Sequence, residues 1–413
     1  MKVCFITYGC KVNQAETQKL EKSLRERGYT VTTIPEEASI WIINTCAVTQ
    51  KAEIQSRQII NKAKKLGKKA FVTGCYVEFC KVENSENLKI FPNHKKDNII
   101  NAFERLYKDE TLRISEKISR HRAIVKIQDG CNQYCSYCIV PYLRGKPKSY
   151  DIEKILDEIK DYERSGIKEI ILSGINIGLY GIDYNEKINL NELIKIILKK
   201  TSDLRIRLSS IEVNHINQEF LEIISDRRIC KHLHIPLQHG SDRILNLMNR
   251  KYNVFQYSQI LERIFKLYPD ISIGTDIIVG FPSETEEDFK KTLQLIEKTG
   301  FSYLHVFTYS RRPLTKASEM TEHVPEKIKK YRANSLIEVG KRKKLEYIKK
   351  FIGSQLEVLI ENKKNGFFSG TSENYIKCFI DNKKEPIIAG NIYKVNVKNT
   401  VGEYVFASLI KDR

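Results

Sequence analysis

Three cysteines in the middle of the chain have the type and spacing of metal ligands. Cys131, Cys135 and Cys138 stand in the run Gly-Cys-Asn-Gln-Tyr-Cys-Ser-Tyr-Cys, and no fourth cysteine follows nearby. Three thiolates can hold a 4Fe-4S cluster with one iron left open, and an open iron can chelate the amino and carboxylate groups of a small ligand. Zinc needs four cysteine or histidine ligands close by, and the nearest histidine, His121, precedes the adjoining strand. The spacing therefore favours an iron-sulfur site over a zinc site.

A second set of three cysteines is dispersed through the first hundred residues. Cys10, Cys46 and Cys75 each come directly after a predicted strand, in the runs Tyr-Gly-Cys, Asn-Thr-Cys and Thr-Gly-Cys. The carboxyl ends of neighbouring parallel strands open onto one crevice, so three such loops can supply three ligands to a second cluster. The residues alone leave an alternative open, because cysteine is also a small side chain that is often buried among apolar ones.

The remaining four cysteines fit neither set, and we interpret Cys4, Cys80, Cys230 and Cys378 as structural. Cys80 is close enough in sequence to Cys75 to take its place as a ligand. The chain has ten cysteines, and only some of them are regularly spaced. In a reducing compartment this pattern indicates metal-binding or redox cysteines rather than a disulfide framework.

Each cysteine set must be positioned by a domain. Across residues 1–115 short apolar strands alternate with amphipathic helices, which is typical of a parallel α/β domain. The strands are predicted at 3–7, 29–34, 40–44 and 70–73, and the helices at 16–27 and 51–66. The segment 84–120 is polar, and one short helix is predicted there before the connection to the next domain.

The alternation resumes at a larger scale across residues 116–350. Six strands are predicted, at 124–127, 169–172, 204–208, 232–235, 271–275 and 303–307. A crossover helix lies between successive strands, and Ser283 with Glu286 offers a capping box for one of them. A closed eight-unit barrel typically takes about 250 residues and only about 190 are available, so we predict a partial (βα)6 TIM-like barrel. The central cysteines follow its first strand, at the mouth where such barrels place active sites.

The last part of the chain predicts a small β-barrel over residues 351–413. A helix rich in Lys and Arg at 326–350 precedes strands at 356–360, 375–380, 392–397 and 404–409, with turns such as 364–366 between strands. Such barrels often present one face to RNA, and Phe367, Phe368 and Tyr375 could stack on bases. The alternative is that these three rings are ordinary core aromatics.

The charge of the chain favours a polyanionic partner. Its 413 residues include 70 Lys and Arg against 51 Asp and Glu, which gives a net charge of +19. Nucleic acid is the first candidate, and a Lys-rich background composition is the alternative. No uninterrupted apolar run approaches the ~20 residues of a membrane helix, and the first residues lack the apolar core of a signal peptide. We expect a cytoplasmic protein with no membrane partner.

The central motif resembles the signature of the radical S-adenosylmethionine (SAM) superfamily, with Tyr137 before its last cysteine. Within that superfamily, four runs are similar to the methylthiotransferase family: Gln-Asp-Gly-Cys at 128–131, Ile-Val-Pro-Tyr-Leu-Arg-Gly at 139–145, His-Leu-His-Ile-Pro-Leu-Gln at 232–238 and Gly-Phe-Pro at 280–282. The similarity spans essentially the whole chain. The predicted C-terminal barrel resembles a TRAM domain, which is a tRNA-holding module.

The resemblance implies two 4Fe-4S clusters and SAM as cofactors. Cys131, Cys135 and Cys138 are implied as the catalytic set that holds the radical-generating cluster, and Cys10, Cys46 and Cys75 as ligands of an auxiliary cluster. SAM is implied as both methyl donor and radical source. Residues at the strand ends of the barrel are then candidates for SAM binding: Tyr137, Ser173, Gly174, Asn176, Ser209, Glu212, Gln238 and Asp276. Taken singly, each Ser or Asn could instead be a helix cap or a turn residue.

The resemblance also implies a substrate. The run Tyr-Gly-Cys-Lys-Val-Asn-Gln-Ala-Glu at 8–16, through Lys11 and Val12, is similar to the group that methylthiolates C2 of N6-threonylcarbamoyladenosine (t6A) at position 37 of tRNA. The implied partners are a tRNA anticodon stem-loop carrying t6A and an electron donor such as flavodoxin or ferredoxin, and the implied state is a monomer. Three alternatives stay open: isopentenyladenosine in tRNA, a ribosomal protein aspartate, and a non-catalytic iron-sulfur protein that binds RNA.

Overall fold

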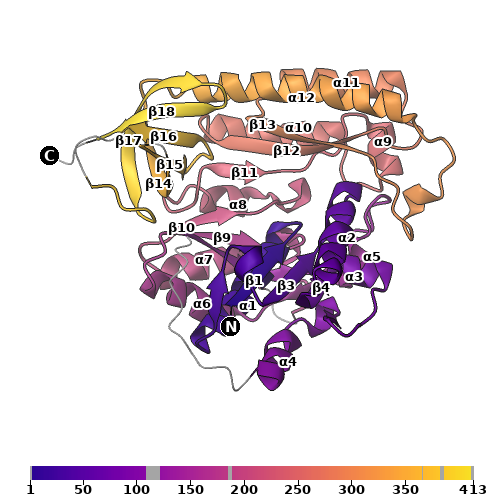
Figure 1. The fold of residues 1–413 in the computed structure, drawn as a ribbon. Helices are drawn as coiled ribbons and strands as arrows, with labels where there is room; N and C mark the ends of the chain where they lie inside the picture. The colour runs from indigo at the N-terminus through magenta and orange to yellow at the C-terminus, as the bar shows by residue number, and fades with distance from the viewer. Residues whose placement is uncertain (1, 108–120, 185–187, 365, 382–385, 411–413) are drawn as a thin grey trace.

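The computed structural model describes residues 2–107, 121–184, 188–364, 366–381 and 386–410. The chain forms an N-terminal α/β part, a central α/β part and a C-terminal β-barrel (Figure 1). In this view the N-terminal helices lie below the central strands, and α12 (Glu326–Lys349) runs along the top toward the C-terminal barrel. The predicted boundary between residues 115 and 116 lies outside the described residues.

The N-terminal sheet has five parallel strands in the order β2-β1-β3-β4-β5. The strands are β1 (Lys2–Thr7), β2 (Thr30–Thr32), β3 (Ile40–Thr45), β4 (Lys69–Gly74) and β5 (Leu88–Phe91). The helices are α1 (Lys11–Glu26), α2 (Gln50–Lys65), α3 (Cys75–Cys80) and α4 (Asn98–Tyr107). The central strand β3 is buried along its whole length, as expected for a parallel sheet that is covered on both faces.

The predicted parallel α/β fold is confirmed, although α3 and β5 are absent from the prediction and the first helix begins earlier. The strand β5 is absent from the sequence prediction, because its few apolar residues stand in a polar and charged segment. The first helix begins at Lys11 rather than at Glu16, so Cys10 is the residue directly before it. The N-terminus of α1 therefore lies beside the first cysteine of the dispersed set.

The central part has the six parallel strands that the sequence predicts. They are β6 (Arg122–Lys126), β9 (Glu169–Ser173), β10 (Arg205–Leu208), β11 (His232–His234), β12 (Ser272–Val279) and β13 (Tyr303–Thr308). They pair as two three-stranded sheets, β10-β9-β6 and β11-β12-β13. Backbone pairing of Ile206 with Ile229 joins the two sheets. The predicted partial (βα) barrel is thereby confirmed.

Helices and one short hairpin complete the central part. The helices are α5 (Val140–Arg144), α6 (Ile152–Arg164), α7 (Leu190–Lys200), α8 (Gln218–Ile223), α9 (Asp242–Leu247), α10 (Val254–Leu267) and α11 (Glu286–Lys298). The hairpin pairs β7 (Gln128–Asp129) with β8 (Lys148–Ser149). The predicted capping box of Ser283 and Glu286 is wrong, since Thr285 and Asp288 form the box of α11. Ser283 instead has a positive φ of 67° and precedes the helix.

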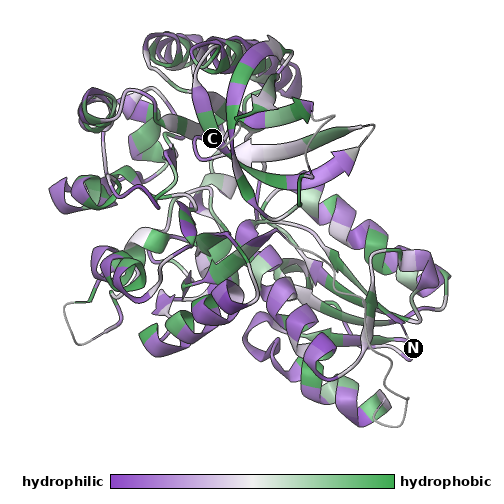
Figure 2. Cartoon of the chain, turned by 90° about the vertical axis from the view of Figure 1, so that its left-hand side faces the viewer, coloured by the Kyte–Doolittle hydropathy of each residue, from purple (hydrophilic) through white to green (hydrophobic). Residues whose placement is uncertain are grey.

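The two faces of the central strands make different contacts. The surrounding helices turn hydrophobic residues toward the strands and hydrophilic ones outward (Figure 2). On β9, Ile170 packs in this helix-covered core, whereas Ile171 faces the opposite way and packs against Ala15 of α1. Gln18 of α1 accepts a hydrogen bond from the backbone N–H of Ile124 on β6 (3.0 Å). The first helix of the chain therefore covers the inner face of β6 and β9.

The C-terminal part is a closed barrel with the strand order β14-β15-β16-β18-β17. Its strands are β14 (Gln355–Lys364), β15 (Phe367–Ser372), β16 (Lys377–Asp381), β17 (Ile392–Val401) and β18 (Tyr404–Leu409). The predicted small β-barrel is present, but the prediction lacks β15. Among the described residues, no helix has both the length and the apolarity needed to cross a bilayer.

The three aromatic candidates for base stacking have different positions. Phe368 is in the barrel core, as the alternative interpretation holds. Phe367 is partly exposed and contacts Phe406 edge to face. Tyr375 lies in the turn between β15 and β16 with a φ of 66°, and its ring stacks on His232 of β11 with centroids 4.2 Å apart. Tyr375 therefore helps to dock the barrel on the central strands.

A buried carboxylate also joins the C-terminal barrel to the central strands. Glu169, at the start of β9, is fully buried and accepts hydrogen bonds from Nε of Arg205 (2.7 Å) and Nε of Arg207 (3.0 Å). Arg205 also donates to the backbone oxygen of Glu357 (2.9 Å). Arg207 donates to the backbone oxygen of Ser372 (2.9 Å). One carboxylate thus orients two guanidinium groups that hold strands β14 and β15.

Candidate active site

The loop after β7 carries Cys131, Cys135 and Cys138. The backbone N–H of Cys131 donates to the carbonyl of Gly145 (3.0 Å), and that of Cys138 donates to the carbonyl of Cys135 (2.9 Å). Burial, together with the neighbouring Cys135, raises the pKa of Cys138 to about 12. The three thiols thus lie within electrostatic reach of one another on one ordered loop. Three sulfur ligands without a fourth suit a 4Fe-4S cluster with one open iron.

One buried arginine ties this loop to the neighbouring strand ends. Arg250 donates from Nη1 to the sulfur of Cys135 (3.1 Å) and forms an ion pair with Glu212. Burial raises the pKa of Glu212, and Arg250 only partly offsets this effect. Glu212, a predicted SAM contact, is therefore connected to the cysteine loop. Arg250 carries no motif in the sequence and was missed by the sequence prediction.

Three of the predicted SAM contacts are buried with polar atoms that find no partner among the described residues. The atoms are Oγ of Ser173, Nδ2 of Asn176 and Oγ of Ser209. Buried polar groups are normally hydrogen-bonded, so these atoms at the strand ends fit a role as hydrogen-bonding partners of a bound molecule. The helix-cap alternative applies to Asn176, whose Oδ1 accepts from the N–H of Gly178 (3.2 Å). Its amide nitrogen nevertheless remains free for a ligand.

Gly174 lies where no larger residue fits. A Cβ at this position would be 2.9 Å from Oε1 of Gln128. The same Oε1 accepts a hydrogen bond from the backbone N–H of Asn176 (3.0 Å). The side chain of Gln128 thus fixes the 173–176 turn, and the glycine is needed for this close approach.

The last three predicted contacts have different environments. Tyr137 is part of the cysteine loop and packs against the cluster that contains Phe281 and Met248. Gln238 has a φ of 68°, and its backbone N–H donates to the carbonyl of Asp276 (2.8 Å). The prediction that Asp276 follows the fifth strand is wrong, because β12 continues to Val279 and Asp276 lies within it.

The inner face of the central strands carries a cluster of imidazole and phenol groups that the sequence prediction missed. Asp276 Oδ1 lies 2.9 Å from Nε2 of His234 and 3.2 Å from Nδ1 of His305. Burial opposes ionisation of Asp276, but the two imidazoles hold its pKa below the ordinary value. The hydroxyl of Tyr303 lies 3.0 Å from His234 and 2.9 Å from His232. The alternation of the two histidines on β11 is the signal that places them on one face.

The three dispersed cysteines come together at the carboxyl edge of the N-terminal sheet. A Cβ on Gly9, which has a φ of 108°, would lie 2.8 Å from Cβ of Cys46. Burial raises the pKa of Cys46 to about 12, and Cys75 and Cys10 act in the same direction. The loops before these cysteines are thus packed against one another, and three thiols in one crevice fit a second cluster.

Cys80 lies apart from this group. It ends helix α3, which Cys75 begins, and its electrostatic neighbours are Tyr76, Glu53 and Arg57. None of the three dispersed cysteines is among them. This arrangement favours Cys75 over Cys80 as the third ligand.

A buried ionic network lies between the two cysteine sets. Glu16 of α1 forms ion pairs with Lys96, with Lys126 (2.7 Å) and with Arg144 (3.0 Å). Although burial alone would raise the pKa of Glu16, these three cations hold it well below its usual range. Asp129 accepts from Lys126 (2.5 Å) and from Arg144 (3.0 Å). The network therefore joins the N-terminal and central parts directly beside both sites.

Lys11 is the cation of this region that has no partner. Its side chain makes no hydrogen bond or ion pair with any described residue. Burial with Arg207 and Arg122 nearby lowers its pKa to about 8, and the carboxylate of Glu169 only partly offsets this effect. It directly follows Cys10 and lies close enough to His232 to lower the pKa of that imidazole. Lys11 thus places an unpaired positive charge between the N-terminal cysteines and the inner face of the barrel.

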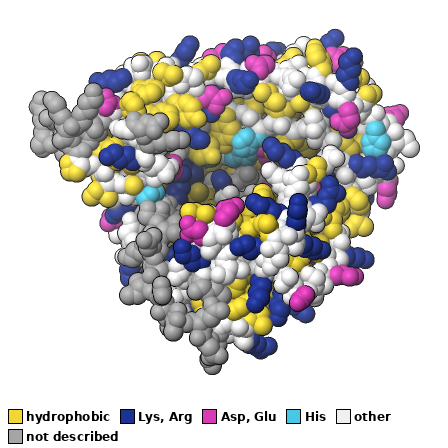
Figure 3. All heavy atoms as spheres, viewed as in Figure 1, with side chains coloured by type: hydrophobic (Ala, Val, Ile, Leu, Met, Phe, Trp, Pro, Cys, Tyr) yellow, Lys and Arg dark blue, Asp and Glu magenta, His cyan; other side chains and the backbone are white. Residues whose placement is uncertain are grey.

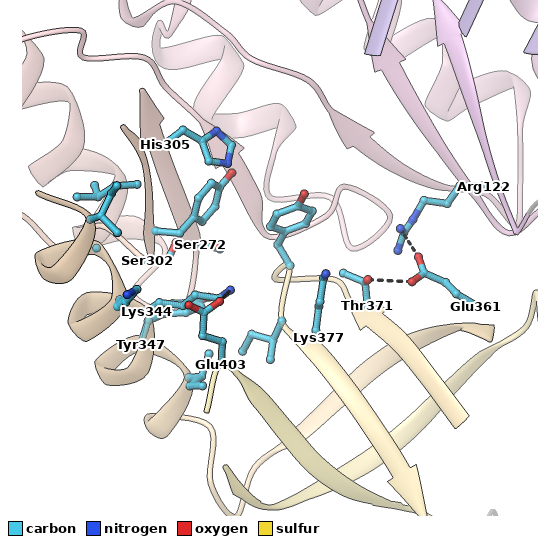
Figure 4. Close-up of a pocket in the computed structure, with 18 residues that line it drawn as sticks. Arg122, Ser272, Ser302, His305, Lys344, Tyr347, Glu361, Thr371, Lys377 and Glu403 are labelled. Carbon is cyan, nitrogen blue, oxygen red and sulfur yellow. Dashed lines mark hydrogen bonds and ion pairs between the residues drawn. The ribbon is translucent and has the colours of Figure 1, made fainter. Parts of the chain in front are cut away.

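A cavity of about 500 Å³ lies between β13, α12 and the C-terminal barrel (Figure 4). Its wall includes Tyr303 and Tyr375. Its charged residues are Arg122, Lys341, Lys344, Lys377, Glu361 and Glu403. Both acids are paired, Glu361 with Arg122 and Glu403 with Lys344. Figure 3 shows the hollow on this face, with Lys and Arg side chains around it. The wall therefore combines aromatic rings with an excess of positive charge.

Two family profiles cover most of the described chain. The profile "Radical SAM superfamily" matches residues 125–296, and the profile "Uncharacterized protein family UPF0004" matches residues 2–94. Among solved structures, that of the radical SAM methyltransferase TsrM from Kitasatospora setae, with a tryptophan substrate and a SAM analogue bound, has a TM-score of 0.55 at 12% identity. The likeness covers 77% of this chain and 75% of that one. It supports the central fold.

Curated relatives extend over nearly the whole chain. The threonylcarbamoyladenosine tRNA methylthiotransferase MtaB of Aquifex aeolicus is 38% identical over 93% of this chain and 98% of its own length. The MtaB of Thermotoga maritima is 37% identical, over 97% and 95%. The tRNA-2-methylthio-N(6)-dimethylallyladenosine synthase of Acetivibrio thermocellus is 36% identical, over 87% and 80%. With this identity along the full length, the chain belongs to the methylthiotransferase family of radical SAM enzymes.

Proposed function

We propose that this enzyme methylthiolates C2 of t6A at position 37 of tRNA and produces 2-methylthio-N6-threonylcarbamoyladenosine. The family brings SAM and 4Fe-4S clusters as cofactors. When bound, they supply the radical and sulfur chemistry. Cys131, Cys135 and Cys138 would hold one cluster, and the dispersed cysteines at 10, 46 and 75 would hold the other. The observation that carries the proposal is that the fold gathers both sets around one network of charged side chains, with the inner face of the barrel between them.

The residues of this chain have clear tasks in such a reaction. Ser173, Asn176 and Ser209 would orient SAM through the buried polar atoms that otherwise have no partner. Helix α1 covers the inner face of β6 and β9 and so keeps water from that side. Positioning of this kind matters because a reactive radical source must lie next to its target and away from solvent.

The unpaired charge of Lys11 supports t6A over isopentenyladenosine. The threonylcarbamoyl group ends in a carboxylate, whereas the isopentenyl group is an uncharged hydrocarbon. A largely enclosed ammonium group without a direct ion-pair partner among the described residues favours an anionic ligand. The names of the Aquifex and Thermotoga relatives point to the same substrate. The name of the Acetivibrio relative keeps isopentenyladenosine as the second candidate.

The cavity beside the C-terminal barrel supports RNA as the substrate. Its lysines suit phosphates, and the exposed side of Tyr375 suits a base. A TRAM-like role for the barrel agrees with the net charge of +19. Binding should therefore weaken as salt rises. A low-potential electron donor such as flavodoxin or ferredoxin and a cytoplasmic, monomeric enzyme complete the proposal.

Nucleoside mass spectrometry tests the substrate directly. Transfer RNA from cells that lack this protein should contain t6A but no 2-methylthio derivative of it. Expression of the wild-type gene should restore the derivative, and expression of the Cys46→Ala variant should not. If the t6A derivative persists in the deletion strain and methylthio-isopentenyladenosine is lost instead, the proposed substrate is wrong.

A substitution at Lys11 tests the basis of substrate choice. Loss of a hydrogen bond to a charged group costs about 1.5–3 kcal/mol, so Lys11→Met should lower kcat/KM for a t6A stem-loop by about 10- to 100-fold. Lys251→Met serves as the control, because Lys251 is an exposed lysine whose side chain bonds only to Asn249 among the described residues. Equal activity of the Lys11→Met and wild-type enzymes on t6A would contradict a role in carboxylate recognition.

A further inference from the structure

Arg144 lies between the two cysteine sets and bonds to residues that hold the loops of both sets. It ends helix α5, only a few residues after Cys138, and its side chain is 1% exposed. Its Nη1 lies 3.0 Å from Oε1 of Glu16 and 3.0 Å from Oδ1 of Asp129. Its Nη2 donates to Oδ1 of Asn13 (2.7 Å). One guanidinium group thus reaches two residues of α1 and one of the central part.

On the N-terminal side, Asn13 also bonds to two of the cysteine loops. Its Nδ2 donates to the carbonyl oxygens of Tyr8 and Thr45, both at 2.9 Å. These residues lie just before Cys10 and Cys46 in the sequence. The side chain of Asn13 therefore fixes the two loops relative to each other, and Arg144 fixes Asn13.

On the central side, Asp129 supports the other cysteine loop. Its Oδ1 accepts from Arg144 and also from the backbone N–H of Gly130 (2.8 Å), the residue before Cys131. A Cβ on Gly130 would lie 2.1 Å from the carbonyl oxygen of Lys146, so the turn packs closely against Lys146 and requires a glycine. A continuous chain of short contacts thus links the Cys10 and Cys46 loops to the Cys131 loop.

The charges of this network do not cancel. Three cations, Lys96, Lys126 and Arg144, face two carboxylates, Glu16 and Asp129, which leaves one positive charge in excess. A buried charge without compensation is costly. Cys10 and Cys75 are electrostatic neighbours of Arg144, and cysteines bind metals as thiolates. The excess charge is therefore placed to compensate the N-terminal thiolates.

We propose that Arg144 is a positioning residue for both cluster sites: its guanidinium group sets the separation of the two cysteine sets, and its charge stabilises the negative charge of the N-terminal one. The inference rests on the proposed second cluster. A guanidinium group suits this task because it offers five donors in a rigid plane, whereas a lysine offers one mobile point charge.

Two substitutions separate the charge from the geometry. Arg144→Gln removes the charge, and Arg144→Lys keeps it but loses the planar fork. Both are made in the Cys135→Ala protein, in which only the N-terminal cluster should assemble, and the midpoint potential of that cluster is followed by EPR in a redox titration. Removal of a nearby positive charge disfavours electron uptake, so Arg144→Gln should shift the potential to more negative values. Arg144→Lys should leave it near that of the parent protein.

Hydrogen exchange on the iron-free proteins measures the geometric role without any cluster. Peptides that cover Tyr8–Cys10 and Thr45–Cys46 should exchange faster in both Arg144 variants than in the parent. Arg332→Gln is the matched control, since Arg332 is equally buried and pairs with Glu284 and Glu286 away from both cysteine sets. It should leave these two peptides unchanged.

The outcomes distinguish this inference from the function on which it rests. An unchanged potential in Arg144→Gln with its iron intact would overturn the charge role. Unchanged exchange at both loops would overturn the positioning role. A Cys135→Ala protein that binds no iron would contradict the second cluster itself, and the exchange measurement on iron-free protein would still decide the role of Arg144.

Discussion

Replacement of Glu169 by glutamine should loosen the C-terminal barrel while the N-terminal sheet stays intact. Glu169 is fully buried and is the carboxylate that both Arg205 and Arg207 contact. The glutamine has nearly the same size, so the change removes the charge without creating a cavity. Two buried guanidinium groups then lose their counter-charge, and both of them hold backbone carbonyls of the barrel.

The size of the effect follows from these contacts. Breaking a buried ion pair by removal of one partner typically costs about 3–5 kcal/mol. Arg205 and Arg207 keep their hydrogen bonds to the carbonyls of Glu357 and Ser372, so the lower end of this range, about 3 kcal/mol, is expected. Since 1.36 kcal/mol corresponds to a factor of ten, local opening of the docked strands should become about 100-fold more frequent.

Hydrogen exchange followed by mass spectrometry measures this opening. Peptides from β14, β15 and β16 should exchange about 100-fold faster in Glu169→Gln, whereas peptides from β3 and β4 should not change. Glu287→Gln is the control, because Glu287 forms an exposed ion pair with Lys291 on α11, and such pairs contribute little. If the barrel strands exchange at the wild-type rate in Glu169→Gln, the carboxylate does not hold the barrel and the reasoning is refuted.

Three further predictions concern acid stability and the two cysteine sets. Burial alone would raise the pKa of Glu169. The charges of Arg207, Arg205 and Arg122 have a larger opposite effect and hold the pKa below its ordinary value. The ionised carboxylate therefore stabilises the folded protein above the ordinary glutamate pKa of about 4.3, and this stabilisation is lost as the pH falls below that value. Between about pH 5 and 3 the urea midpoint of Glu169→Gln should thus depend less on pH than that of the wild-type protein. Cys135→Ala should abolish 5′-deoxyadenosine release, whereas Cys46→Ala should retain it and lose methylthio transfer; full transfer by Cys46→Ala, measured by nucleoside analysis, would contradict the second cluster. Gly74→Ala should reduce the iron content from about eight to about four per chain, because the new Cβ would lie 2.2 Å from the carbonyl of Thr45 and displace the Cys75 loop. An unchanged iron content would show that this loop tolerates the displacement.

Local patterns in the sequence were sufficient to predict the order of the elements. The alternation of apolar strands and amphipathic helices predicted the parallel N-terminal sheet, the six central strands and the C-terminal barrel. It failed for two strands whose formation depends on tertiary contacts. The strand β5 is a short edge strand within a polar segment, and β15 contains Ser, Gly and Thr, which give no strong strand pattern. The capping box moved from Ser283 to Thr285 because the same short run offers two candidate caps.

The sequence likewise indicated some residues of the candidate site and not others. The C-x3-C-x2-C spacing pointed to the central cysteine set. The position of Cys10, Cys46 and Cys75 after predicted strands pointed to the dispersed set, because strand ends of a parallel sheet meet at one edge. Arg144, Arg250 and His305 could not be found in the same way, since each acts on a partner far away in the sequence. Asp276 was predicted to follow the fifth strand but lies within it, because the length of β12 depends on its pairing with β13 and not on its own residues.

The first helix determines how the Cys10 loop is held relative to the central part. With 16 residues and a rise of about 1.5 Å per residue, α1 is a rod about 24 Å long. One end follows Cys10, and further along the helix Lys22 is tied to Asp161 of α6 (3.2 Å). Between these two points, Gln18 accepts a hydrogen bond from the backbone N–H of Ile124 (3.0 Å), so the helix contacts the central part along its length. The position of the Cys10 loop relative to the central part is therefore set by the folded chain before any substrate binds.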